Sequence, residues 1–164
     1  IGDIGGKIWL AHLASAMGVC AVDNICGKTN SFRYDLIPGC IFTAPEIGSV
    51  GLSETQCKEQ GIEYNIGKFP FAALGKAMAI NETDGFVKII ADKQTDQVLG
   101  VHIIGPHATD LISEAVPAMN LEITATELGK AIHAHPTLGE AMMEAAHAVH
   151  GECAHMPAPR KKHK

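Results

Sequence analysis

The stretch GFVKIIADKQTDQVLGVHIIG, residues 85–105, decides the fold of this chain. Two runs rich in β-branched residues flank the polar loop DKQTD, a pattern typical of two antiparallel strands joined in a hairpin. Further runs predict strands upstream, and these are CIFTAPEIGSVGL in two pieces around Pro45, IEYNIGKFPF, and KAMAINE. The order of these runs predicts an antiparallel sheet over residues 39–105.

Helical signals lie on both sides of the predicted sheet. Residues 9–27 carry apolar side chains at helical spacing and end on Gly27, which predicts one long helix over roughly 8–26. A polar, turn-rich linker, KTNSFRYDLIPG, follows it. Inside the sheet region, Ser53 and Gln56 form a capping box that predicts a short helix ending at Gly61.

Three helices are predicted after the sheet, each led by a threonine. They start near Thr109, Thr124 and Thr137, and the last two threonines have a glutamate three residues later. Pro117 predicts that the first of these helices kinks or stops near Val116. The resulting class is α+β, an antiparallel sheet with helices packed on it, preceded by a long N-terminal helix.

Composition limits the function classes. The chain has 164 residues and 17.3 kDa, with 46% hydrophobic and only 19% charged residues. This balance predicts one folded domain with an apolar subunit interface. There is no apolar run long enough for a membrane span and no secretory signal, so we expect no membrane partner. Residues 1–159 hold 9 basic and 18 acidic residues, which argues against a nucleic-acid partner.

Cysteine usage indicates a reducing compartment, either the cytoplasm or an organelle matrix. The five cysteines are odd in number and form no C-x-x-C pair, so we expect free and mostly buried thiols. Glycine-rich nucleotide motifs and a G-x-S-x-G element are also absent from the sequence.

The segment IHAHPTLGE, residues 132–140, carries the most specific chemistry. Pro136 disfavours helix at His135, so this histidine lies just outside a helix that Thr137 caps. Glu140 then falls at the third helical position, from which its carboxylate can bend back toward His135 and fix the ring tautomer. The alternative is that Glu140 serves only the cap and His135 is an ordinary turn residue. His133 points away by alternation and is expected to be structural.

A second histidine cluster lies near the C-terminus. His147, His150, Cys153 and His155 are spaced as ligands of a soft divalent metal could be. An exposed chain end with coincidental histidines explains the same pattern, and we therefore predict no metal site. The basic residues after Pro157 are expected to form a solvated tail or a short anion-binding element.

The residues His133-Ala-His-Pro-Thr-Leu-Gly-Glu140 resemble the C-terminal active-site motif of the dihydrolipoamide (dihydrolipoyl) dehydrogenases, within the flavin-dependent pyridine nucleotide–disulfide oxidoreductases. Further similarities follow in the family's order over residues 1–151. They are Gly2-Asp3, Leu10-Ala-His12, Thr43–Gly51, Phe86-Val-Lys, Val98-Leu-Gly and Ile104-Gly-Pro-His. The paired His-Ala-His form resembles the dihydrolipoamide branch more than the glutathione or mercuric reductases.

This resemblance implies a domain organisation. Residues 1–38 would be the end of an FAD-binding domain, residues 39–151 the interface (dimerisation) domain with the FAD/NAD-linked reductase fold, and residues 152–164 a flexible basic tail. Asp3 would bond the flavin's ribityl chain, and Leu10, Ala11 and His12 would face the flavin ring.

The resemblance also implies a function. In a homodimer, His135 would be the acid/base toward the partner subunit's dithiol and redox cysteines, and Glu140 would orient it. The partners would be a lipoyl-bearing acyltransferase or carrier protein of a 2-oxo acid dehydrogenase or glycine cleavage complex, and the cofactors FAD and NAD. A cis His135–Pro136 peptide would fit the family.

The chain departs from the family in lacking the redox cysteine pair and both the FAD and NAD glycine motifs. We therefore expect this chain to be inactive alone and to hold neither cofactor stably. Two other functions stay open. One is a non-catalytic dimerisation or metal-binding module, and the other is the same domain of a glutathione- or mercuric-reductase-like enzyme.

Overall fold

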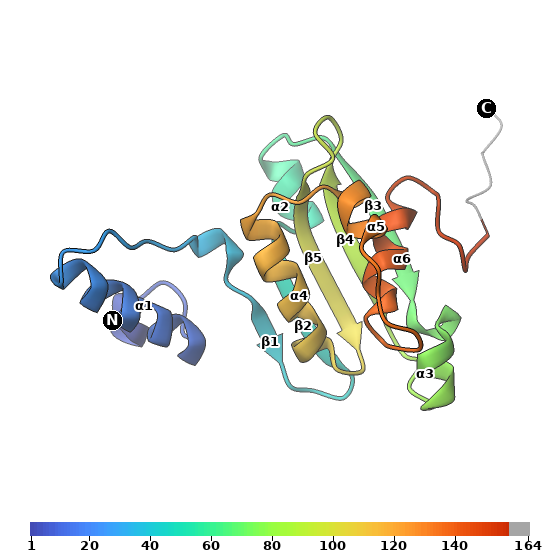
Figure 1. Cartoon of the computed structure of the whole chain (residues 1–164), viewed down its shortest axis with the longest axis horizontal. Helices are drawn as coiled ribbons and strands as arrows, with labels where there is room; N and C mark the ends of the chain where they lie inside the picture. Colours follow the sequence, from blue (N-terminus) through green and yellow to red (C-terminus); the bar gives the residue numbers. More distant parts are fainter. Residues whose placement is uncertain (158–164) are drawn as a thin grey trace. The chain divides into compact units, whose positions relative to one another are not determined.

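Figure 1 shows the computed structural model, which describes residues 1–157. The chain divides into two compact units, one formed by Ile1–Ile37 and one that begins at Pro38.

The first unit consists of a helix and two short turns of 3-10 helix. They are η1 (Gly2–Gly5), α1 (Ala11–Ile25) and η2 (Tyr34–Leu36). The predicted long helix is confirmed, but it begins three residues later than expected because Leu10 has an extended backbone, with φ −139°. On α1 only Leu13 is buried, whereas Val19, Val22 and Ile25 are exposed. This helix therefore presents more apolar surface than its own unit covers.

The second unit is built on a five-stranded sheet, and every strand pairs antiparallel to its neighbours (Figure 1). Its strand order is β1-β2-β5-β4-β3. The strands are β1 (Gly39–Ile41), β2 (Glu46–Gly51), β3 (Tyr64–Pro70), β4 (Phe86–Asp92) and β5 (Val98–Gly105). The hairpin predicted from residues 85–105 is confirmed as β4 and β5, which lie at the centre of the sheet with β2 and β3 on either side.

Helices cover this sheet, which confirms the predicted α+β class. The helices of the second unit are α2 (Glu54–Glu59), α3 (Gly75–Ala79), α4 (Ala108–Asn120), α5 (Ala125–Lys130) and α6 (Glu140–Ala148), with a 3-10 turn, η3, at Phe71–Ala73. In Figure 1, α4 lies over β2 and β5, and α6 lies over β3 and β4 on the same face. Within residues 1–157, none of the helices is both long and apolar enough to cross a membrane.

The helix-covered face of the sheet forms the core. Residues directly opposite each other on paired strands point to the same face. One such row runs from Gly48 through Ile103 and Val87 to Phe69, and all three large side chains are buried. The opposite face carries Lys88 beside His102, so period-2 alternation along the strands separates core from polar surface.

Close backbone contact holds α6 on the sheet. A Cβ placed on Gly67 of β3 would lie 1.9 Å from the carbonyl oxygen of Ala145 and 2.6 Å from the nitrogen of Val149. Only a residue without a Cβ lets α6 approach β3 this closely. The position of α6 therefore depends on a glycine in an edge strand.

One predicted strand is wrong. The segment KAMAINE contains most of α3 and is not a strand. The apolar positions that favour this helix begin upstream of the segment, at Phe71. Phe71, Leu74 and Ala77 are all buried and recur every three residues. That spacing matches a helical period and not the alternation of a strand.

Of the two outcomes predicted for Pro117, a kink or a stop near Val116, the stop is wrong. α4 continues through Pro117 to Asn120, and it buries Ala108, Ile112, Ala115 and Met119. An interior proline costs a helix about 3 kcal/mol. Burial of this helix face against β2 and β5 offsets that cost, so tertiary packing decides the end of the helix.

The cysteines are free, as predicted, but they are not mostly buried. Only Cys57 is buried, Cys26 is exposed, and Cys20, Cys40 and Cys153 are intermediate.

We predict that Gly67→Ala destabilises the second unit. The new Cβ would meet backbone atoms of α6, which cannot move aside as a side chain can. The free energy of unfolding should fall by about 1–3 kcal/mol or more. Urea denaturation followed by circular dichroism measures this change.

Gly75→Ala is the matched control, because nothing lies within 4 Å of its added Cβ. Its stability should stay unchanged or rise by up to about 1 kcal/mol through helix propensity. Equal losses for the two variants would contradict the role assigned to close approach at Gly67.

Candidate active site

His135 and Glu140 form a hydrogen-bonded pair at the start of α6. Nδ1 of His135 lies 2.9 Å from Oε1 of Glu140. The two side chains differ sharply in burial, because that of His135 is 78% exposed and that of Glu140 is 13% exposed. The carboxylate is thus set into the protein surface and the imidazole stands out from it. The predicted bend of Glu140 back toward His135 is confirmed.

The turn before α6 differs from the predicted cap. The helix begins at Glu140 with Gly139 as its N-cap, so Glu140 is the first helical residue and not the third. Thr137 does not cap α6, because its hydroxyl donates to the carbonyl of Ala134 at 2.7 Å. Its backbone N–H instead donates to Oε2 of Glu140 at 2.8 Å. The His135–Pro136 peptide is cis, as the resemblance predicted.

The two partners of Glu140 fix its charge. Burial alone would raise the pKa of the Glu140 carboxyl, but the hydrogen bonds from Thr137 and His135 outweigh burial and lower this pKa below its ordinary value. An ionised carboxylate only accepts hydrogen bonds, so Nδ1 of His135 carries the proton. In the neutral ring, Nε2 of His135 then has the lone pair that can take up a proton.

A cavity of about 210 Å³ adjoins this pair. His135 and Glu140 line it together with Glu144 of α6 and His155 of the C-terminal segment. Its other walls are Ala73, Leu74, Gly75 and Met78. The cavity therefore combines two histidine–carboxylate pairs with an apolar wall from η3 and α3.

The C-terminal segment is anchored on Glu144, which the sequence analysis did not identify. This carboxylate is 1% exposed and accepts hydrogen bonds from the Cys153 thiol at 2.8 Å, from the Ala154 N–H at 3.0 Å and from Nδ1 of His155 at 2.6 Å. Residues 152–157, which we expected to belong to a flexible tail, are thus held against α6. The basic residues 158–164 lie outside the described residues.

The charge of Glu144 depends on this anchoring. Burial alone would raise the pKa of Glu144, but the hydrogen bonds from Cys153, His155 and Ala154 lower it. A carboxyl with a depressed pKa contributes stability above its unfolded-state pKa, and this contribution is lost as the pH falls through the folded-state value. One signal for Glu144 exists in the sequence, since it is an acidic residue among the apolar positions Ala141, Met142 and Ala145.

We predict that Cys153 reacts slowly with alkylating reagents. Burial, together with the hydrogen bond to Glu144, raises the pKa of its thiol from 9.0 to about 11. Because the thiolate is the nucleophile, alkylation by iodoacetamide at pH 8 should be at least about tenfold slower than in the denatured chain. Peptide mass mapping over time measures the rate at each cysteine.

Exposed Cys26 serves as the internal control and should react at similar rates in the folded and denatured chain. Glu144→Ala should speed the alkylation of Cys153. Fast alkylation of Cys153 in the native chain would contradict its contact with Glu144.

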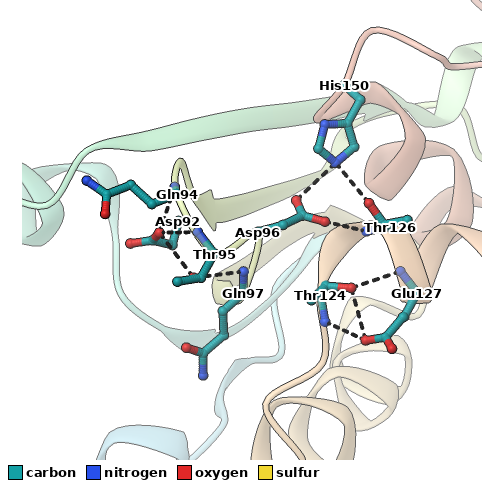
Figure 2. Close-up of polar contacts among 9 residues, drawn as sticks. All are labelled: Asp92, Gln94, Thr95, Asp96, Gln97, Thr124, Thr126, Glu127 and His150. Atoms are coloured by element: carbon teal, nitrogen blue, oxygen red, sulfur yellow. Dashed lines mark hydrogen bonds and ion pairs between the residues drawn. The ribbon is translucent and has the colours of Figure 1, made fainter.

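The second histidine cluster does not gather around a shared point. Figure 2 shows His150 paired with Asp96 of the β4–β5 turn, with Nε2 of the ring 2.9 Å from Oδ1. The other oxygen of Asp96 accepts the backbone N–H of Thr126 at 2.9 Å, so the end of α6, this turn and the start of α5 are joined. His155 binds Glu144 instead. Among residues 1–157, no group of three or more His, Cys, Asp or Glu side chains is arranged to hold a metal.

The four predicted flavin-contacting residues all lie in the first unit. Asp3 belongs to η1, and its side chain is exposed. Leu10 is the N-cap of α1, and Ala11 and His12 form its exposed first turn. No side chain caps this helix start, so its backbone N–H groups and the positive end of the helix dipole are suited to an electron-rich ring edge. These residues fit the flavin contact that the resemblance implies.

The fold and the histidine–glutamate pair together define the class of protein. A family model described as "Pyridine nucleotide-disulphide oxidoreductase, dimerisation domain" matches residues 37–146. The chain belongs to the pyridine nucleotide–disulphide oxidoreductase family, and most of its length is that family's dimerisation domain.

Relatives with established names match nearly the whole chain. The chain is 52% identical over 156 residues to dihydrolipoyl dehydrogenase of Bacillus subtilis, which covers 94% of this chain and 33% of the relative. It is 47% identical to the mitochondrial dihydrolipoyl dehydrogenase 2 of Arabidopsis thaliana, over 95% of this chain and 31% of the relative. A leghemoglobin reductase of Glycine max is also 47% identical, over 92% of this chain and 29% of the relative. The chain thus spans about a third of the length of these relatives.

Solved structures show the same fold. The crystal structure of LpdA from Mycobacterium tuberculosis matches with a TM-score of 0.83 and 28% identity, over 88% of this chain and 32% of that chain. A flavoprotein disulfide reductase, RclA of Escherichia coli, matches with a TM-score of 0.80 and 24% identity, over 87% of this chain and 33% of that chain. The second likeness concerns the fold alone.

Proposed function

We propose that this chain is the interface domain of a flavin-dependent dihydrolipoyl dehydrogenase, in which His135 and Glu140 act on the dithiol/disulfide site of the partner subunit. The observation that carries the proposal is the hydrogen bond between Glu140, whose side chain is 13% exposed, and the exposed His135. An acid/base that served its own subunit's interior would be enclosed, whereas this ring stands free to enter another site. The names of the relatives support the substrate class.

Proton transfer is the chemistry that this chain supplies. Nε2 of His135 takes a proton from a substrate thiol, and Glu140 stabilises the resulting imidazolium through Nδ1. The thiolate that remains is the form that attacks a disulfide sulfur. The residues of this chain thus turn a weak thiol nucleophile into a strong one.

The cofactors of the proposed enzyme are FAD and NAD. The chemistry that FAD supplies when bound is transfer of the electron pair from the dithiol to NAD⁺. In this chain, Asp3 and the first turn of α1 at Leu10, Ala11 and His12 would hold the flavin. They are one edge of a site whose remaining residues belong to the rest of such an enzyme.

The proposed partners are a second copy of the chain and a lipoyl-bearing carrier or acyltransferase. Large apolar side chains are exposed on the second unit, as a subunit interface requires. They are Ile41, Phe42, Ile66, Met78, Ile80, Leu121 and Ile132. The free thiols support a reducing setting, the cytoplasm or an organelle matrix.

The proposal predicts the effect of His135→Ala in a complete flavoprotein that contains this chain. Loss of a general acid/base should lower kcat for dihydrolipoamide oxidation by about 10²–10⁴-fold. The flavin absorbance and the dimer should persist, because the ring is exposed and takes no part in the core. Steady-state kinetics with dihydrolipoamide and NAD⁺ measure this effect.

His107→Ala is the control, since it removes an exposed histidine that lies 3.4 Å from Asp110 and lines a different cavity from the one beside His135. It should leave kcat unchanged. Near-normal turnover of the His135 variant would refute the proposed acid/base role.

The proposal also predicts self-association of the isolated chain. Sedimentation equilibrium should give twice the monomer mass of 17.3 kDa at micromolar concentration. Replacing exposed Phe42 or Leu121 with glutamate should weaken the dimer without changing the circular dichroism spectrum. A stable monomer at all concentrations would argue for a different use of these apolar side chains.

A further inference from the structure

His133 binds two hydrogen-bond acceptors on different elements. Nε2 of its ring lies 2.7 Å from Oε1 of Glu114 on α4, and Nδ1 lies 2.9 Å from the carbonyl oxygen of Ala131, the C-cap of α5. The side chain of His133 is 10% exposed and that of Glu114 is 36% exposed. This ring is therefore enclosed where the ring of His135, two residues later, is open.

Both partners of the ring are groups that accept hydrogen bonds. A backbone carbonyl only accepts hydrogen bonds, and so does an ionised carboxylate. The ring therefore bridges α5 and α4, and it donates to both acceptors at once when it is the imidazolium. A hydrogen bond between an imidazolium and a carboxylate is charge-assisted, the stronger kind.

The ring of His133 also lies near the far end of the loop that carries His135. A Cβ added to Gly139, the N-cap of α6, would lie 3.6 Å from Cδ2 of His133. The hydrogen bonds of His133 join the residue at the end of α5 to a side chain of α4. They hold the chain two residues before His135.

We propose that His133, held by Glu114, is a positioning residue for the His135–Glu140 pair. The inference rests on the proposed function, because His133 affects the reaction only through the His135–Glu140 pair. With the ring of His133 bonded to Ala131 and to Glu114 of α4, the backbone at His135 stays in the place from which Nδ1 reaches Glu140. Without this tie, the exposed ring of His135 has only its own hydrogen bond to hold it.

Glu114→Ala tests the proposal without threatening the fold, because alanine favours helix and Glu114 lies at the surface of α4. In the 164-residue chain, NMR follows the Nδ1 proton of His135 that is bonded to Glu140. We expect this signal to broaden or disappear in Glu114→Ala, while the thermal midpoint of unfolding changes little. Glu114→Gln keeps an acceptor and should restore part of the signal.

Variants of His133 separate its two bonds. His133→Gln keeps a donor for Glu114, His133→Asn keeps one for Ala131, and His133→Ala keeps neither. The Nδ1 signal of His135 should be weakest in the alanine variant and intermediate in the other two. His107→Ala, also beside α4, is the control and should leave it unchanged.

Kinetics in the complete flavoprotein distinguish this inference from the proposed function. Glu114→Ala should lower kcat about tenfold or more with KM within twofold, since small displacements of a catalytic group have effects of this size. It should add nothing in the His135→Ala background. An intact Nδ1 signal of His135 together with unchanged kcat in Glu114→Ala would overturn the inference. If His135→Ala itself has no effect on kcat, the proposed function fails instead.

Discussion

The close approach of α6 to β3 at Gly67 is the constraint on which the rest of the second unit depends. The helix lies so near the strand that its Ala145 carbonyl occupies the space of a missing side chain. This contact holds the second half of α6 against the strand, and Glu140 is the first residue of the same helix. The geometry of the candidate active site therefore follows from backbone packing several residues away. Gly48 of β2 allows the same close approach of α4, because a Cβ there would lie 2.4 Å from the carbonyl oxygen of Ala108.

Paired histidines and carboxylates recur around the end of the chain. Glu140 and Glu144, one turn apart on α6, bind His135 and His155, while Glu114 on α4 binds His133. The side chains of Glu140 and Glu144 are 13% and 1% exposed. Glu114 is more exposed, but it holds the enclosed ring of His133. The carboxylates hold these imidazoles in defined orientations. The side chains of His135 and His155 are 78% and 64% exposed, whereas that of His133 is 10% exposed.

The sequence predicted the central features because they are local. Alternation of β-branched residues around DKQTD specifies the β4–β5 hairpin, and the Ser53 and Thr124 capping boxes form as predicted. The His135–Glu140 contact also follows from short-range geometry, since the two residues are five apart with a turn between them. Local rules failed where a distant surface took over, as at Pro117, where burial against β2 and β5 outweighs the cost of proline. They failed again at Thr137, whose hydroxyl donates to the carbonyl of Ala134 and does not cap α6.

The amino-acid sequence by itself determined the α+β class, the β4–β5 hairpin and the identity of the histidine–glutamate pair. These depend on side-chain periodicity and on neighbours a few residues apart. Only the tertiary structure decided that Glu144 is buried and anchors residues 152–157, and that Glu114 holds His133. Both contacts join elements that the chain brings together by folding, so no spacing within the sequence specifies them.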